Sequence, residues 1–192
     1  AARSSTSRVP VAAAYRAELD GTVAFTEAPR LQYADFALWQ SSATADENAE
    51  RHVDYWRAAL GGAPEELPLP YDRRRLPVPT EVGGEAWTTI DADVTTALRD
   101  LAAAQGVSMF MIAEAAVAVL YSRLGAGEDI VLGSPVAGRG TGDLDDLVGL
   151  FVDTLPTRID LSGNPAISDV LARVRAVVLD GFAHQDVQFE DI

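Results

Sequence analysis

Two short apolar runs that enclose a glycine-rich segment constrain the fold of this chain most. The runs at residues 130–132 and 154–159 have the length and composition of buried strands. Glycine allows backbone conformations and close approaches that residues with side chains resist. Arg139 lies in this segment as a permanent cation, among Gly133, Gly138, Gly140 and Gly142. The segment is therefore predicted to hold backbone and one guanidinium close to another group.

Helical patterns flank these two strands. One predicted helix ends at Gln105 and exits through Gly106 in a left-handed conformation. Ser108 caps the next, residues 109–124, which is apolar nearly all round, as core helices of α/β proteins are. Pro165 marks the start of a third, whose predicted inner face consists of Ile167, Val170, Leu171, Val174 and Val178.

The first part of the chain is less regular. Pro10 begins a short predicted helix, and a second predicted helix ends at Gly61. Prolines make residues 64–79 an extended connector, and residues 86–90 alternate in the manner of a further strand. One apolar cluster between the two helices is too dense for a solvated surface: Leu31, Phe36, Leu38 and Trp39.

Charge and composition exclude several classes of function. The 192 residues carry a formal charge of −14, which opposes binding to nucleic acid and to anionic membranes. All 15 basic residues are arginine, so a Schiff-base lysine and a P-loop lysine are excluded. Without cysteine there is no thiolate nucleophile and no disulfide. We expect a cytoplasmic protein, because no long apolar leader or membrane span is evident.

No familiar catalytic or metal motif is complete. The glycines at 133 and 138 have phosphate-loop spacing, but Arg139 occupies the position that requires lysine. The aspartates at 143, 145 and 146 lack the glycine and terminal glutamate of a calcium loop. Ser134 lacks the G-x-S-x-G elbow of a hydrolase nucleophile. We therefore predict no metal site and no catalytic residue within these residues.

Four segments together resemble a known family. They are YADFALWQ (33–40), DIVLGSPVAGR (129–139), VGLFVDTLPTR (148–158) and HQDVQFE (184–190). Their order and spacing are similar to those of condensation domains of nonribosomal peptide synthetases, in the chloramphenicol-acetyltransferase-like superfamily. The resemblance implies an α/β lobe with helices packed on a mixed sheet. The family's HHxxxDG motif would precede Ala1 and its last motif would follow residue 192, so we expect a lobe truncated at both ends.

The resemblance also implies an organisation and an activity. Residues 1–30 would be a remnant helix of the first lobe and a loop, 31–80 the crossing helices and connector, and 81–192 the C-terminal lobe. Family members join a donor acyl thioester to an acceptor amine, each carried on the phosphopantetheine arm of a peptidyl carrier protein. This chain would bind no cofactor directly and would be inactive alone. Its partners would be carrier proteins and a first lobe, or a second copy of itself.

Two alternatives remain open beside that function. One is a catalytically silent recruitment or interaction module, and a weaker one is an acyltransferase that uses another thioester carrier. The first is favoured by Asp153, which stands where the family usually has asparagine. An ionised carboxylate only accepts hydrogen bonds, so it would repel a developing oxyanion that an amide could stabilise.

Site residues follow from the resemblance, motif by motif. The resemblance implies a tunnel between two lobes, and the positions that line it would be Gly149, Phe151, Asp153 and Thr154. Positions that hold the lobes together would be Gly138, Arg139, His184, Gln185 and Asp186. Arg139 matches the arginine that pairs with the aspartate of HHxxxDG, and without that partner it must be solvated or meet another group.

Overall fold

The computed structural model describes residues 15–22, 31–43, 47–73, 78, 82–139, 142–145 and 147–187. By its contacts the chain divides into two compact units. The first unit consists of residues 1–53, 135–153 and 186–192, and the second unit of residues 54–134 and 154–185. The three-part organisation implied by the family resemblance stays a prediction.

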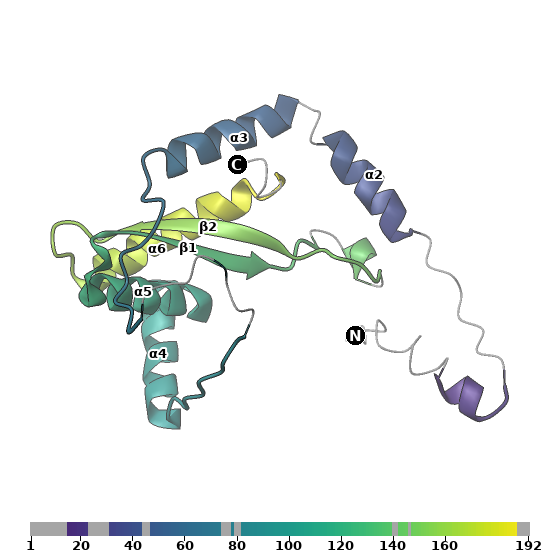
Figure 1. Ribbon diagram of the computed structural model, residues 1–192, viewed down its shortest axis with the longest axis horizontal. Coiled ribbons are helices and arrows are strands. Elements are labelled where there is room, and N and C mark those ends of the chain that lie inside the picture. Colours follow the sequence, from purple (N-terminus) through teal and green to yellow (C-terminus); the bar gives the residue numbers. More distant parts are fainter. Residues whose placement is uncertain are drawn as a thin grey trace. The chain divides into compact units, whose positions relative to one another are not determined.

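Strands β1 (Asp129–Val136) and β2 (Asp153–Asp160) form a two-stranded sheet (Figure 1). The N–H of Leu161 donates to the carbonyl of Glu128 at 2.7 Å, and Gly133 faces Thr154, so the strands run antiparallel. Both predicted strands are confirmed. The predicted mixed sheet is not found in the described part of the chain. Residues 86–90 lack a strand partner there and leave Trp87 88% exposed, so alternation without a partner produces no third strand.

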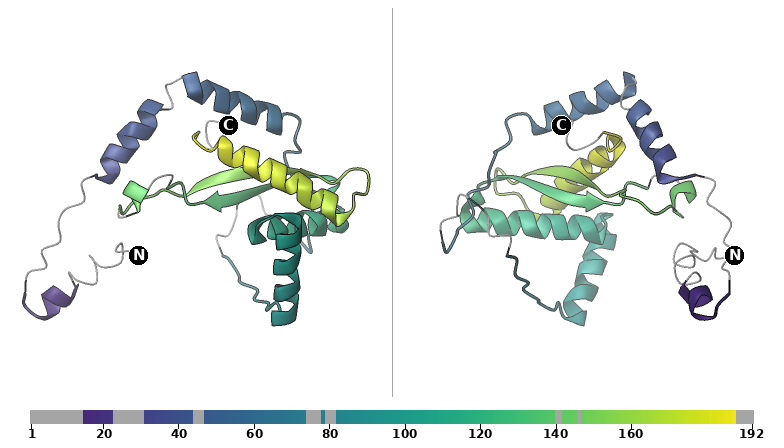
Figure 2. Two further views of the ribbon diagram at one scale, coloured as in Figure 1. Left: turned by 180° about the vertical axis from the view of Figure 1, so that it is seen from behind. Right: turned by 45° about the vertical axis from the view of Figure 1, so that its right-hand side comes forward.

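The second unit also contains the helices α4 (Ala92–Gln105), α5 (Met109–Tyr121) and α6 (Ile167–Ala183). The hydroxyl of Ser108 accepts the N–H of Met111 at 3.2 Å and caps α5 as predicted. Helices α5 and α6 pack together against the sheet (Figure 2). Their shared core includes Ala115, Ala118, Ile130, Ile159, Val170, Leu171, Val174 and Val178. Ile167 is exposed, so its predicted place on the inner face of α6 was wrong.

A π-helical turn, η1 (Ser122–Ala126), connects α5 to β1. Gly125 has a φ of 99°, which a residue with a side chain rarely adopts, so the helix changes direction there. By length and composition alone, residues 109–126 would be sufficient to cross a membrane, a property that core helices of soluble proteins share. Helix α5 packs against α6 and buries Glu114 among hydrogen-bond donors, so we describe it as a core helix.

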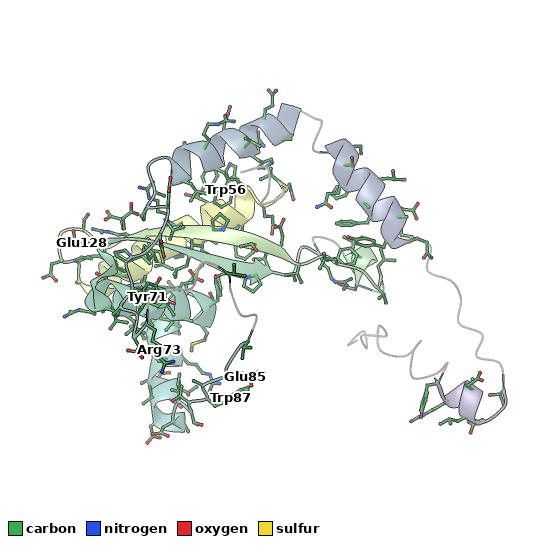
Figure 3. All side chains as sticks on the ribbon, viewed as in Figure 1. Trp56, Tyr71, Arg73, Glu85, Trp87 and Glu128 are labelled. Atoms are coloured by element: carbon green, nitrogen blue, oxygen red, sulfur yellow. The ribbon has the colours of Figure 1, made fainter. Side chains whose placement is uncertain are left out.

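The C-terminal half of α3 (Glu47–Leu60) is part of the second unit and is bonded to other elements of that unit at two places. Trp56 points from α3 toward α6, and its indole N–H donates to the carbonyl of His184 at 2.9 Å (Figure 3). Arg158 on β2 donates to the carbonyls of Ala59 and Gly61 at 3.1 and 2.9 Å. Its guanidinium also forms two hydrogen bonds with Asp129 at 2.9 and 2.8 Å, which raise the pKa of Arg158. A cation thus satisfies one carbonyl in the last turn of α3 and the carbonyl of the residue directly after the helix.

The first unit contains α2 (Tyr33–Ala43), a short helical stretch at residues 15–19, and η2 (Gly142–Leu144). The predicted start of a helix at Pro10 lies outside the described residues. Leu38 and Trp39 are largely exposed, so the predicted burial of the whole cluster around them was wrong. The helical period of α2 directs Tyr33 and Phe36 to Phe151 and leaves Leu38 on another face.

Candidate functional site

Arg139 is a charged residue of the first unit. Gly138, which precedes it, has a φ of 55°, and a Cβ there would overlap the carbonyl oxygen of Phe151. Only glycine allows this close approach of two backbone segments. The Arg139 guanidinium then lies 4.0 Å from the centroid of the Phe151 ring and donates to the carbonyl of Leu144. The arginine is therefore held by an aromatic face and a backbone acceptor.

Phe151 supplies that aromatic face and is itself held in place. Its side chain is 6% exposed. Its ring meets Tyr33 edge-on at 5.4 Å with an interplanar angle of 87°, and meets Phe36 at 4.7 Å and 52°. Aromatic pairs favour such edge and tilted geometries because the positive edge of one ring meets the negative face of the other. Phe151 thus packs between α2 and Arg139. Its place in the wall of a tunnel stays a prediction.

Tyr33 joins α2 to the segment around Phe151. Its hydroxyl donates to the carbonyl of Leu150 at 2.9 Å. A Cβ at Gly149 would overlap the Tyr33 ring, so the absence of a side chain at 149 makes room for that ring. Tyr33 lies in the YADFALWQ motif, but the sequence alone indicates no role for it. Only its contacts, across more than a hundred residues, reveal one.

Asp153 and Thr154 begin β2. Asp153 is half-buried and Thr154 is exposed. A Cβ added at Gly133 would lie 3.2 Å from the methyl carbon of Thr154, so the two strands come close at this point. Whether these two side chains line a substrate tunnel stays a prediction.

His184 is placed by its neighbours in the second unit. Its imidazole stacks on Tyr55 with centroids 3.8 Å apart and planes 10° apart, and its Nδ1 lies 2.8 Å from the carbonyl of Asp180. Burial, together with the negative charge of Asp180, raises the pKa of the Tyr55 hydroxyl. The structure thus places His184 at the end of α6, followed by Gln185 and Asp186, which are exposed. Its assigned role in holding two lobes together stays a prediction.

A buried carboxylate that the sequence did not reveal as important lies in the second unit. Glu114 on α5 is 7% exposed. One carboxylate oxygen accepts from the Thr157 hydroxyl at 2.6 Å, and the other accepts from the Ser134 hydroxyl. Buried charges need such partners, so Glu114 bonds α5 to both strands. The only signal in the sequence was one acid in an apolar run. Among the described residues, no group of three acidic or histidine side chains could hold a metal ion.

The family of this chain follows from its match to known proteins. Residues 11–192 match the family model described as the condensation domain. The chain belongs to the condensation domain family. A condensation domain of this family was predicted from the four motifs, and that prediction is confirmed.

Relatives of this condensation domain are peptide synthetases and related domains. It is 44% identical over 165 residues to the probable non-canonical nonribosomal peptide synthetase CymA of Salinispora arenicola, covering 83% of this chain and 2% of CymA. Among solved structures, the X-domain from teicoplanin biosynthesis is 33% identical with a TM-score of 0.89, covering 95% of this chain and 42% of that chain. That X-domain has also been solved in complex with OxyB.

A second solved structure supports the fold. The first condensation domain of the CDA synthetase has a TM-score of 0.69 at 24% identity, covering 94% of this chain and 39% of that chain. The predicted chloramphenicol-acetyltransferase-like α/β lobe, with helices packed on a sheet, is confirmed by this likeness. This condensation-domain chain thus spans about two fifths of the length of these solved relatives and a small part of CymA.

Proposed function

We propose that this chain contributes one side of an amide-forming condensation site in a nonribosomal peptide synthetase. The observation that carries the proposal is the family match over residues 11–192. In this function, a carrier-bound acceptor amine attacks the carbonyl carbon of a carrier-bound donor thioester. A C–N bond forms, the C–S bond breaks, the thiol of the donor arm leaves, and the amine loses one proton.

Positioning supplies most of the catalysis in this proposal. An α-amine has a pKa of ~7.7–8.0, so about a tenth of it is already neutral near pH 7. Holding a neutral amine next to a thioester converts a bimolecular step into an effectively unimolecular one. The 192 residues contain two histidines, His52 and His184, and no HHxxxDG motif. We therefore assign proton handling to a lobe that carries this motif, and lobe positioning to the segment around Arg139.

Carrier proteins are the proposed partners. The substrates reach the site on phosphopantetheine arms that belong to those carrier proteins, so the chain needs no resident cofactor. A peptide synthetase works on substrates activated inside the cell, so we propose that the protein acts in the cytoplasm as a soluble domain. We propose further that residues 81–192 form the C-terminal lobe and residues 31–80 cross to its partner.

The test is a condensation assay with donor and acceptor loaded on separate carrier proteins, read by mass spectrometry of the acceptor carrier. We expect no product from the 192 residues alone and product when an HHxxxDG-bearing first lobe from a relative is added. The control is the same first lobe with the second histidine of HHxxxDG replaced by alanine. Product from the 192 residues alone would overturn the proposal, as would no product from the combined lobes.

A second candidate function is recruitment of a separate protein without catalysis. It is favoured by the higher likeness to the X-domain from teicoplanin biosynthesis, which has been solved in complex with OxyB. Asp153 supports the same candidate, because its carboxylate cannot donate a hydrogen bond to an oxyanion. The variant Asp153→Asn distinguishes the two candidate functions. If this variant forms more condensation product than the wild type in the combined-lobe assay, the first candidate is supported. Tight binding of a partner protein with no turnover in either form supports the second.

A further inference from the structure

Among the described residues of the first unit, Arg139 contacts two uncharged groups. Its described contacts are the carbonyl of Leu144 and the face of the Phe151 ring, 4.0 Å away. An arginine side chain has several rotatable bonds, so a single hydrogen bond leaves its planar group free to swing. The ring face supplies the second constraint and favours a guanidinium stacked upon it. The position of the cation therefore depends on the orientation of the ring.

The orientation of the Phe151 ring depends in turn on α2. Tyr33 contacts the ring edge-on, and Phe36 packs against it at 4.7 Å. The ring centroids of Tyr33 and Phe36 are 5.9 Å apart, so the three rings form one cluster. With its side chain 6% exposed, Phe151 has little room to rotate without displacing the two rings of α2.

Tyr33 holds the backbone beside Phe151 as well as its ring. Its hydroxyl donates to the carbonyl of Leu150, and its ring occupies the space left by Gly149. The two residues directly before Phe151 are thus bound to the same tyrosine. On the other side, Gly138 lies against the Phe151 carbonyl, directly before Arg139. Displacement of the 149–151 backbone would therefore shift Arg139 through two routes.

We propose that Tyr33 is a positioning residue that fixes the Arg139 guanidinium through Phe151. The proposal rests on the proposed function, in which Arg139 sets the register of two lobes. It assigns a role to the tyrosine of the YADF segment, which acts at a distance from the reacting atoms. Loss of its hydroxyl should slow the chemical step and leave the binding of carrier proteins unchanged.

The first arm of the experiment measures kcat and KM in the combined-lobe condensation assay. We expect Tyr33→Phe and Phe151→Leu each to lower kcat about threefold to tenfold, a range set by the loss of one hydrogen bond in the first variant and of a cation–π contact in the second. KM for the carrier substrates should stay unchanged. Phe151→Tyr, which keeps the ring face, should restore most of the rate lost in Phe151→Leu. The matched control is Tyr71→Phe, which changes an exposed tyrosine of the second unit and should leave kcat and KM at the wild-type values.

A double variant distinguishes positioning from general stability. Arg139→Lys keeps the charge and loses the planar group that stacks. If Tyr33 acts through Arg139, Tyr33→Phe should have no further effect on kcat in the Arg139→Lys background. Effects that multiply, or a Tyr33→Phe variant with wild-type kcat, would overturn the proposal.

The second arm needs no catalysis. Nuclear magnetic resonance of the 192-residue chain reports the order of the Arg139 Nε–H group. We expect an ordered group in the wild type and in Tyr71→Phe, and a mobile group in Phe151→Leu and Tyr33→Phe. If these variants leave the group ordered, the proposal is wrong. If the wild type forms no product in the combined-lobe assay but the Arg139 group loosens in the variants as expected, the proposed function fails and the positioning role stands.

Discussion

Replacing Thr157 by valine tests whether the buried Glu114 carboxylate depends on its two hydroxyl donors. Thr157 is fully buried, and its hydroxyl donates to Glu114 at 2.6 Å. Valine has nearly the same shape, so the change removes a hydrogen bond without leaving a large cavity. The carboxylate keeps the donor of Ser134 and loses the other. Water cannot replace the lost donor easily, because Glu114 is 7% exposed.

The expected loss of stability is about 2 kcal/mol, since a hydrogen bond to a charged group contributes ~1.5–3 kcal/mol. That is a large fraction of the ~5–15 kcal/mol that stabilises a typical domain. Urea unfolding followed by circular dichroism should show a midpoint lowered by about 1 M, given a slope of ~1–3 kcal/mol/M. The control Thr96→Val removes an exposed hydroxyl on α4 that donates to the carbonyl of Ala92. It should change stability by less than about 0.5 kcal/mol.

A double variant examines the same reasoning further. Glu114→Leu removes the acceptor and leaves two buried hydroxyls without it, so it should also be destabilising. Glu114→Leu combined with Thr157→Val should be less destabilising than the sum of the two, because one variant removes the partner that the other leaves unsatisfied. A Thr157→Val protein as stable as the wild type would refute this account. Fully additive single variants would refute it too.

Two further predictions concern the loop and the acid stability. Gly138→Ala should destabilise the chain by about 2 kcal/mol or more, because Gly138 has a φ of 55° and an added Cβ would overlap the Phe151 carbonyl. The control Gly84→Ala should not destabilise it, because nothing lies near an added Cβ at that position. Equal urea midpoints for the two variants would contradict this prediction. Hydrogen bonds from Ser162, with the charge of Arg173, lower the pKa of Asp160. The stability contributed by Asp160 is therefore present above its unfolded pKa and is lost as pH falls through its lower folded pKa. Ser162→Ala should raise the pKa of Asp160 in a carboxyl titration by nuclear magnetic resonance, and an unchanged value would disprove the role of Ser162.

Local features of the sequence predicted the elements that depend on neighbours in the chain. The Ser108 cap and the Gly106 exit defined two helix ends, because capping and left-handed conformations involve residues within one turn. The strands around residues 130 and 155 followed from their apolar composition. The same reasoning failed for residues 86–90, since a strand forms only where a second strand supplies its hydrogen bonds.

The candidate site divides in the same way. The sequence by itself determined the family and indicated Gly138, Arg139 and Phe151 as site residues, because motifs and their order can be recognised without a structure. It did not determine that Tyr33 bonds Leu150, or that Glu114 joins two strands, since these contacts link residues far apart in the chain. A hydrogen bond between distant residues depends on packing that brings donor and acceptor within 3 Å or so of each other. Only the tertiary structure decides which of the many possible pairs meet.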